Sequence, residues 1–408
     1  MLSNSARAIA VVCAAQTLAQ LGAFTFPALL PGFIDEWQLS HSEAGWLSGI
    51  FFGAYCISVP FLVTLTDRIS ARRIYLVAVV VTTCSHIGMA WLAEGFWTGM
   101  LFRTLAGVGW AGTYMVGLRA LSDELEGATR SRGVAMHAAS IGVSGALSFL
   151  IAGFISGWFD WHWAFGLVSL GSLSAMAIAW VAFPRREPIA AGPSAGALLD
   201  FRPVFRNRSA MAYSTGYFVH TWEMFVLRSW AVTFLVFAAT DLDPTTLILI
   251  PTIAAMFMEL TGTVTSVAGN EVALRIGRQR WIMIVMFSSM VLATFVGFSS
   301  GHGYGAALVM VLVYNALIYA DSSSLTAGTV GSADPQRRGA TLAVHGMLGY
   351  GGGFIGPVVM GVLIDSMGGE SVQAWGWGFA HVALVVALGP LALWLLKPKD
   401  LDGDRSTS

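Results

Sequence analysis

The chain has 408 residues, of which 56% are hydrophobic and only 11% are charged, and its formal net charge is −1. A soluble globular domain carries about a quarter charged residues, so this composition excludes an ordinary soluble protein. The near-zero net charge gives no indication of nucleic-acid binding. The three cysteines show neither a disulfide framework nor metal-ligand spacing, and we expect no metal and no cofactor.

Apolar runs recur along the whole chain, and many are about 20 residues long, which is enough to cross a hydrocarbon core of ~30 Å as a helix. The run near the N-terminus follows one arginine and resembles a signal peptide, but the spans behind it favour a first membrane helix. The sequence predicts an all-α polytopic membrane protein with twelve transmembrane helices, roughly at residues 8–30, 44–66, 74–93, 97–121, 134–156, 163–183, 209–237, 245–268, 281–299, 304–330, 341–364 and 374–396.

One connection between spans is much longer than the others. It covers residues 184–208, mixes proline, glycine and arginine, and separates six spans from six. We therefore predict an N-terminal six-helix bundle at 1–183, a linker at 184–208, a C-terminal six-helix bundle at 209–396 and a tail at 397–408.

The basic residues predict the orientation in the membrane. All but three of the 22 Lys and Arg residues lie at the ends of the chain or in every second loop, whereas the intervening loops are acidic. By the positive-inside rule, both termini and the linker face the cytoplasm. We expect a bacterial-type inner membrane. The three exceptions, Arg103, Arg119 and Arg228, lie inside predicted spans.

Short basic motifs repeat in the two halves. The loop after the second span reads TDRISARR (Thr66–Arg73), and the loop after the eighth reads ALRIGRQR (Ala273–Arg280). The fourth span contains RTLAGVGWAG (Arg103–Gly112), an arginine followed by spaced glycines. Similar motifs at matching places indicate a duplicated six-helix unit.

Together these features resemble the major facilitator superfamily over essentially the whole chain. The loop signature of that family is matched by Asp67, Arg68 and the pair Arg72-Arg73. In the second copy Leu274 stands where the acid would be, and Glu271 one turn earlier could substitute for it. The resemblance implies two pseudo-symmetric six-helix bundles and secondary transport by alternating access.

The resemblance also implies gating residues. Asp67 would latch the two halves on the cytoplasmic side, and Arg68 would either join this latch or serve only to orient the protein. Arg103 belongs to the signature of the fourth span, where it helps proton traffic or helix contact.

Charged side chains inside spans are the strongest signal for a functional site. A charge at the middle of a span costs ~2.5–3.5 kcal/mol on the insertion scale, so such residues are expected to face a cavity or a partner. Coupled transport needs a group that changes its protonation, and a carboxyl group in a low-dielectric site can do this. The predicted proton-coupling residues are Glu223, Glu259 and Asp321, with His220 as a relay. The alternative is a static buried salt bridge, for example between Arg228 and one of the two glutamates.

The clues to the solute are fewer. Arg119 and Arg228 are candidates to hold a carboxylate or another oxyanion, because a guanidinium group can donate two parallel hydrogen bonds to a planar anion. The span at 134–156 lacks the Gly-Pro motif usual in drug/proton antiporters of the resembled family. The other predicted solute contacts are polar or aromatic side chains within spans, namely Gln20, Tyr114, Trp222, Asn315 and Tyr319.

The sequence therefore predicts a monomeric secondary transporter in the lipid bilayer that moves a small organic or inorganic anion together with protons. The alternative within transporters is efflux of a drug or metabolite in exchange for protons. A non-transporting sensor with the same fold usually adds long soluble segments, and only about twelve residues follow residue 396. An enzyme is less expected, because no metal-binding or nucleophile pattern is present.

Overall fold

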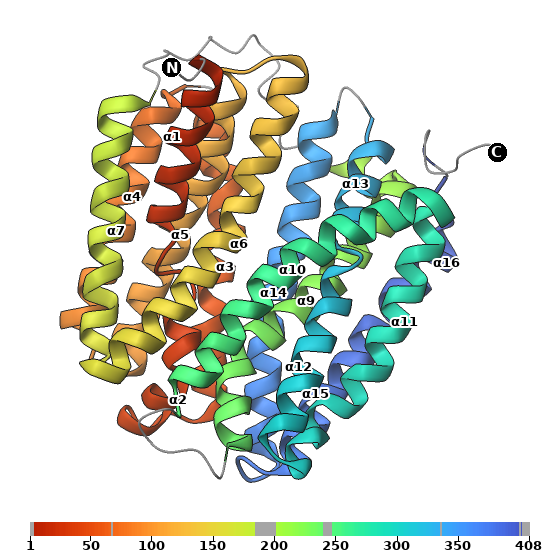
Figure 1. Cartoon of the computed structure of the whole chain (residues 1–408). Coiled ribbons are helices and arrows are strands. Elements are labelled where there is room, and N and C mark those ends of the chain that lie inside the picture. Colours follow the sequence, from red (N-terminus) through yellow and green to blue (C-terminus); the bar gives the residue numbers. More distant parts are fainter. Residues whose placement is uncertain are drawn as a thin grey trace. The chain divides into compact units, whose positions relative to one another are not determined.

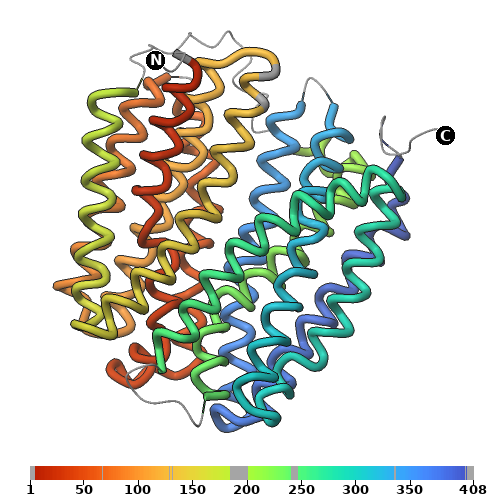
Figure 2. Tube along the Cα trace, in the orientation of Figure 1, coloured from red at the N-terminus to blue at the C-terminus, as the bar shows by residue number. Residues whose placement is uncertain are grey.

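The computed structural model describes residues 4–66, 68–183, 201–239, 247–334, 337–399 and 401. All regular structure among them is helical (Figure 1). This confirms the predicted all-α class, and the described part of every predicted span is helical apart from short breaks. The course of the chain through the helices can be followed in Figure 2.

The part of the chain before residue 207 that the structure describes contains eight α-helices. They are α1 (Asn4–Ala19), α2 (Thr25–Glu36), α3 (His41–Leu65), α4 (Ala71–Trp91), α5 (Phe96–Ser122), α6 (Gly127–Trp158), α7 (Trp161–Ala182) and the short α8 (Arg202–Arg206).

The remaining elements follow from residue 208 onward. They are α9 (Arg208–Ala238), α10 (Leu249–Ile276), α11 (Arg278–Val296), the 3-10 helix η2 (Gly297–His302), α12 (Tyr304–Tyr319), α13 (Ser322–Ser332), α14 (Arg338–Ser366), α15 (Val372–Val386) and α16 (Leu388–Leu396).

Ten segments of the described chain are long and apolar enough to cross a membrane. The first predicted span is not among them, because it is divided into α1 and α2. The helix α5 is also not among them, although it is 27 residues long. It carries Arg103 and Arg119, which lower its hydropathy.

Three spans that were predicted as continuous helices are interrupted in the structure. The chain leaves the helix between α1 and α2, between α12 and α13, and at Ala387 between α15 and α16. At the second break Asp321 is followed by three serines. Asp and Ser favour the start of a helix over its interior, because their side chains compete for backbone hydrogen bonds. This break places the Asp321 carboxyl group between two short helices.

The first break depends on a glycine. Gly22 lies against the imidazole ring of His86, so a side chain at this position would collide with that ring. The turn therefore lets the chain pass close to α4, and Gln20 lies within it.

The contacts divide the chain into two compact units. Unit 1 comprises Met1–Gln38, Ile50–Gly192 and Pro244–Glu259, and unit 2 comprises Leu39–Gly49, Pro193–Asp243 and Leu260–Ser408. Residues 184–200 of the predicted linker lie outside the described residues. The predicted domain boundaries therefore stay a prediction.

Each unit has its own helix packing. In unit 1, α4 packs along α5 and α7, and α1 packs on α6 and α7 around a core that includes Tyr75, Val79 and Val116. In unit 2, α9 is the central helix, because it packs on α12, α13, α14, α15 and α16. Most of its side chains are consequently buried. The charged residues predicted from the sequence on this helix therefore lie inside unit 2.

Candidate transport site

A buried acid–base pair joins α9 to the break between α12 and α13. The Nδ1 atom of His220 lies 2.9 Å from Oδ1 of Asp321, and the two side chains are only 1% and 3% exposed. Asp321 can reach the imidazole ring because the helix stops at Tyr319 and starts again at Ser322. The two atoms are at ion-pair distance, but each lacks an aligned hydrogen-bond partner among the described residues.

Aromatic rings extend this pair toward α14. The ring of Tyr217 stacks on His220 at a centroid distance of 5.7 Å and on His345 at 3.9 Å. The Nδ1 atom of His345 lies 3.0 Å from the Thr329 hydroxyl oxygen. Polar groups therefore continue from Asp321 through unit 2 to the α13–α14 contact.

Glu223 lies one turn after His220 on α9 and is 3% exposed. The Ser289 hydroxyl of α11 donates a hydrogen bond to its Oε2 atom at 3.3 Å, and Tyr314 of α12 also interacts with this carboxyl group. The Oε1 atom has no hydrogen-bond partner among the described residues. One oxygen of this carboxyl group is therefore available to hold a proton or to accept a hydrogen bond from a solute.

Arg228 is 7% exposed and lies among aromatic rings. Its guanidinium carbon lies 5.6 Å from the ring centroid of Phe225 and 5.8 Å from that of Tyr319. The Tyr319 ring also meets His220 edge-on at 6.4 Å. The predicted solute contact Tyr319 thus lies between the predicted anion-binding arginine and the predicted relay.

Two other predicted solute contacts in unit 2 hydrogen-bond to neighbouring helices. The indole N–H of Trp222 donates to Nε2 of His381 at 3.2 Å, and the Asn315 amide donates to the Thr261 hydroxyl at 3.5 Å. They lie on the same helices, α9 and α12, as Glu223 and Tyr319.

Unit 1 holds a second group of buried polar side chains. Gln20 is 2% exposed, and neither its amide nor that of Gln16 has a hydrogen-bond partner among the described residues. Tyr114 stacks on His137 at 5.3 Å. The predicted contacts Gln20 and Tyr114 therefore lie inside unit 1.

The structure places two other predicted residues of unit 1 apart from this group. Arg119 is in the last turn of α5, where its Nε atom lies 3.1 Å from Oδ2 of Asp123, and both side chains are about half exposed. Glu259 is buried beside α6, where a Cβ atom added to Gly145 would come within 2.8 Å of its Oε2 atom.

The predicted gating residues have different surroundings. Asp67 lies outside the described residues, and Arg68 is exposed. Arg103 is 2% exposed, and its guanidinium carbon lies 4.7 Å from the ring centroid of Phe51 and 5.1 Å from that of Phe26.

The second copy of the basic loop contains a contact that the sequence analysis missed. Arg278 is 5% exposed and donates hydrogen bonds to Asn270 Oδ1 at 3.0 Å and to the Ser324 carbonyl oxygen at 3.1 Å. The sequence analysis proposed Glu271 to replace the missing acid, but Glu271 is exposed. The neighbouring amide was the available signal, because Asn270 lies two turns before Arg278.

The described part of the chain contains no group of three or more His, Cys, Asp or Glu side chains that could hold a metal ion. The buried groups of unit 2 described above are hydrogen-bonding side chains, titratable carboxyl and imidazole groups, and the positive charge of Arg228.

Comparisons with known proteins identify the family. The model of the Major Facilitator Superfamily matches residues 12–320. Human protein spinster homolog 1 is 24% identical over 244 residues, which cover 57% of this chain and 46% of the relative. The niacin transporter NiaP of Acinetobacter baylyi is 22% identical over 137 residues, which cover 34% of this chain and 31% of the relative. In each case the match spans less than half of the length of the relative.

A solved structure shows the same fold. A bacterial homolog of the human lysosomal transporter Spinster, in an inward-facing and occupied conformation, superposes with a TM-score of 0.76 at 15% identity and 98% coverage of both chains. The family match, the fold and the apolar helices lead to one conclusion. The chain belongs to the Major Facilitator Superfamily of transporters and is a multi-pass membrane protein.

Proposed function

We propose that this transporter couples solute movement to protons through the buried groups of unit 2. The observation that carries the proposal is the pair of His220 and Asp321, 2.9 Å apart and almost fully buried at a helix break. Glu223 lies one turn away and has one oxygen without a partner among the described residues.

The physical argument is that a proton can move within this pair once a small rotation of the side chains aligns Nδ1 of His220 with Oδ1 of Asp321, which already lie 2.9 Å apart. Two separated charges are expensive in the interior of a membrane protein. A neutral imidazole beside a protonated carboxyl group avoids that cost, and the ionised pair offsets part of it by attraction. The energies of the two forms can therefore be close, as a coupling site requires.

We further propose that the solute is a small anion held by Arg228. A guanidinium group binds a carboxylate through parallel hydrogen bonds, and this one lies beside the Tyr319 ring. One relative is named a niacin transporter, and niacin carries a carboxyl group. Because Arg119 is bound to Asp123 at the end of a helix, we do not assign it to the anion.

Several further statements about the whole molecule belong to the same proposal. We place the protein in a cell inner membrane as a monomer, with both termini in the cytoplasm, since the basic residues gather on one side of the spans. Asp67, Arg68 and Arg103 are proposed to act in gating, and Glu259 is a second proposed carboxyl group for proton binding.

Transport by the purified protein in liposomes tests the proposal. If one proton accompanies one monovalent anion, a gradient of one pH unit supplies about 1.4 kcal/mol and supports about tenfold accumulation. Labelled niacin and other carboxylates or oxyanions are the probes. Glu223→Gln and Asp321→Asn should remove this accumulation while exchange of labelled for unlabelled solute continues. Glu271→Gln, which changes an exposed glutamate of the same unit, is the matched control.

Two outcomes would contradict the proposal. Uptake that ignores the imposed gradient, or that keeps its gradient dependence in both carboxyl variants, shows that these groups do not couple transport to protons. Export of cationic dyes, combined with unchanged anion binding in Arg228→Ala, favours the proton-exchanging exporter of drugs or metabolites instead.

A further inference from the structure

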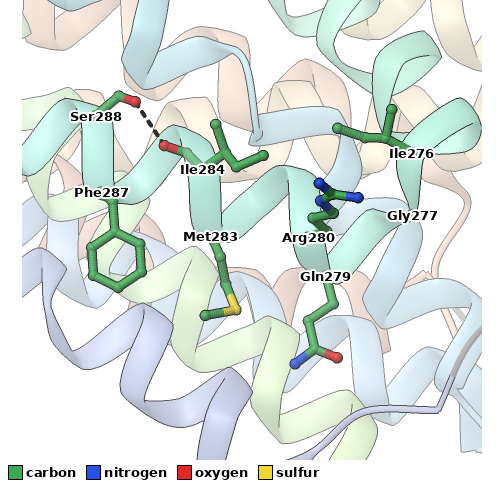
Figure 3. A pocket seen from close by; sticks show the side chains of 8 residues that line it. All are labelled: Ile276, Gly277, Gln279, Arg280, Met283, Ile284, Phe287 and Ser288. Atoms are coloured by element: carbon green, nitrogen blue, oxygen red, sulfur yellow. Dashed lines mark hydrogen bonds between the residues drawn. The ribbon is translucent and has the colours of Figure 1, made fainter.

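A groove of about 920 Å³ lies on the surface of unit 2 at the turn between α10 and α11, well away in sequence from His220 and Glu223. Its wall is formed mainly by the first three turns of α11, as Figure 3 shows. The transport site described above uses none of its residues.

Polar and apolar side chains are sorted along this groove. Arg280 and Gln279 lie in the first turn of α11, and Met283, Ile284 and Phe287 follow one to two turns later. With a rise of 1.5 Å per residue, these apolar side chains lie about 5–10 Å farther along the helix than Arg280. Ile284 is 44% exposed and Phe287 is 50% exposed. Along α11 the groove therefore offers a cation followed by an apolar wall, and Ile276, 38% exposed, lies on the other side of the cation (Figure 3).

The cation of the groove, Arg280, makes no ion pair with a described residue. Arg278, two residues earlier, is buried and hydrogen-bonded to Asn270 and Ser324. Arg280 is exposed, and no described residue pairs with it. Gly277 produces this difference, because its φ of +97° turns the chain sharply between α10 and α11. The turn directs one arginine inward and leaves the other at the rim.

The other polar groups of the groove are already bound. The Gln279 amide donates to the Leu393 carbonyl oxygen at 3.4 Å, and the Ser288 hydroxyl donates to the Ile284 carbonyl oxygen at 2.8 Å, as drawn in Figure 3. The part of the groove beyond Arg280 therefore has an apolar surface, because its polar side chains already have hydrogen-bond partners. A ligand that fits needs an anionic group at one end and a hydrocarbon portion at the other.

We propose that this groove binds an anionic phospholipid of the surrounding membrane, with the phosphate on Arg280 and an acyl chain along Met283, Ile284 and Phe287. Basic pockets at the ends of membrane helices bind anionic headgroups in this way. The order of the groups along α11 matches the order in the lipid, in which a charged headgroup precedes its acyl chains. The proposal requires only that α11 crosses the membrane, and it does not depend on the proton-coupling proposal.

Lipid titrations of the full-length protein in detergent test this site. Phosphatidylglycerol is compared with phosphatidylcholine of the same acyl chains, and bound lipid is counted by native mass spectrometry while the melting temperature is followed. Loss of one charge-assisted hydrogen-bonded contact should weaken phosphatidylglycerol binding about tenfold in Arg280→Gln. Arg280→Lys should keep most of the affinity, because the charge remains.

Two further variants separate this site from general surface charge. Arg275→Gln removes an exposed arginine of the same loop that does not line the groove, and should leave binding unchanged. Ile284→Ser keeps every charge but should weaken lipid binding through its acyl chain.

Three results would overturn the proposal. Equal losses of phosphatidylglycerol affinity in Arg280→Gln and Arg275→Gln indicate nonspecific attraction to surface charge. Equal binding of phosphatidylglycerol and phosphatidylcholine shows that the site does not distinguish the net charge of the headgroup. An equal rise in melting temperature with soluble glycerol phosphate shows that the acyl chain contributes nothing. If Arg280→Gln fails to fold, Arg280→Lys and Ile284→Ser still decide between these cases.

Discussion

Arg103 of unit 1 and Glu223 of unit 2 are both almost fully buried, but their surroundings have opposite characters. The guanidinium group of Arg103 lies over the rings of Phe26 and Phe51 at 5.1 and 4.7 Å. Glu223 lies among hydroxyl groups, one turn from the His220–Asp321 pair. The first environment binds a permanent cation through aromatic faces, whereas the second contains imidazole and carboxyl groups, which are titratable.

The two environments differ in whether their side chains can change charge near neutral pH. Arginine stays protonated in proteins, and an aromatic ring neither gives nor takes a proton at neutral pH. Arg103 can therefore hold helices together or guide charge without titrating. Imidazole and carboxyl groups change charge in the physiological range when their surroundings permit it. The comparison favours His220, Glu223 and Asp321 of unit 2 for the proposed proton chemistry, with Glu259 of unit 1 as the second proposed carboxyl group.

The largest expected effect on stability is at the buried pair. Asp321→Ala leaves His220 without its partner in a site that excludes water, and removing one member of a buried pair costs about 3–5 kcal/mol of unfolding free energy. SDS-driven unfolding of the purified protein measures this loss. The double-mutant cycle of Asp321→Asn and His220→Gln should show a coupling energy of about 1 kcal/mol or more. Additive effects of the two substitutions would show that the pair is close in space without interacting.

The repeated basic loop gives the second test, with a smaller effect. Arg278 in unit 2 is buried and makes two hydrogen bonds, so Arg278→Gln should reduce the unfolding free energy by about 1.5–3 kcal/mol. Arg68 in the corresponding loop of unit 1 is exposed, and Arg68→Gln should change it by no more than about 0.5 kcal/mol. The same unfolding assay compares the two variants. Equal losses would mean that the two loops have kept the same structural role despite their different burial.

Much of the architecture could be predicted from the sequence, because membrane helices must be apolar for their whole length. The same constraint made charged residues conspicuous, so Glu223, Arg228 and Asp321 could be singled out before their surroundings were known. The breaks could not be found in this way, since a polar residue such as Asp321 lowers the hydropathy of a span equally in a continuous or an interrupted helix.

The side chains that interact with the charged residues could not be predicted from the sequence either. Ser289, Tyr314 and Asn270 contribute through helix contacts that hydropathy does not encode. The environment of Arg119 was missed for a related reason. The predicted end of the fourth span is within one residue of the observed one, but hydropathy does not show that Arg119, in the last turn, is half exposed and paired with Asp123 one turn later.

The stability change expected at Arg103 is also small, and this residue tests the comparison most directly. In Arg103→Met two cation–π contacts worth about 0.5–2 kcal/mol each are lost. The cost of burying a cation disappears at the same time, and a flexible methionine can occupy the apolar space. The net change in unfolding free energy should therefore stay within about 1 kcal/mol. In liposomes, the pH dependence of uptake should match that of the unaltered protein, because no titrating group has been removed. If Arg103→Met loses its pH dependence as Glu223→Gln is expected to do, the cation of unit 1 takes part in proton coupling and the division between the units is wrong.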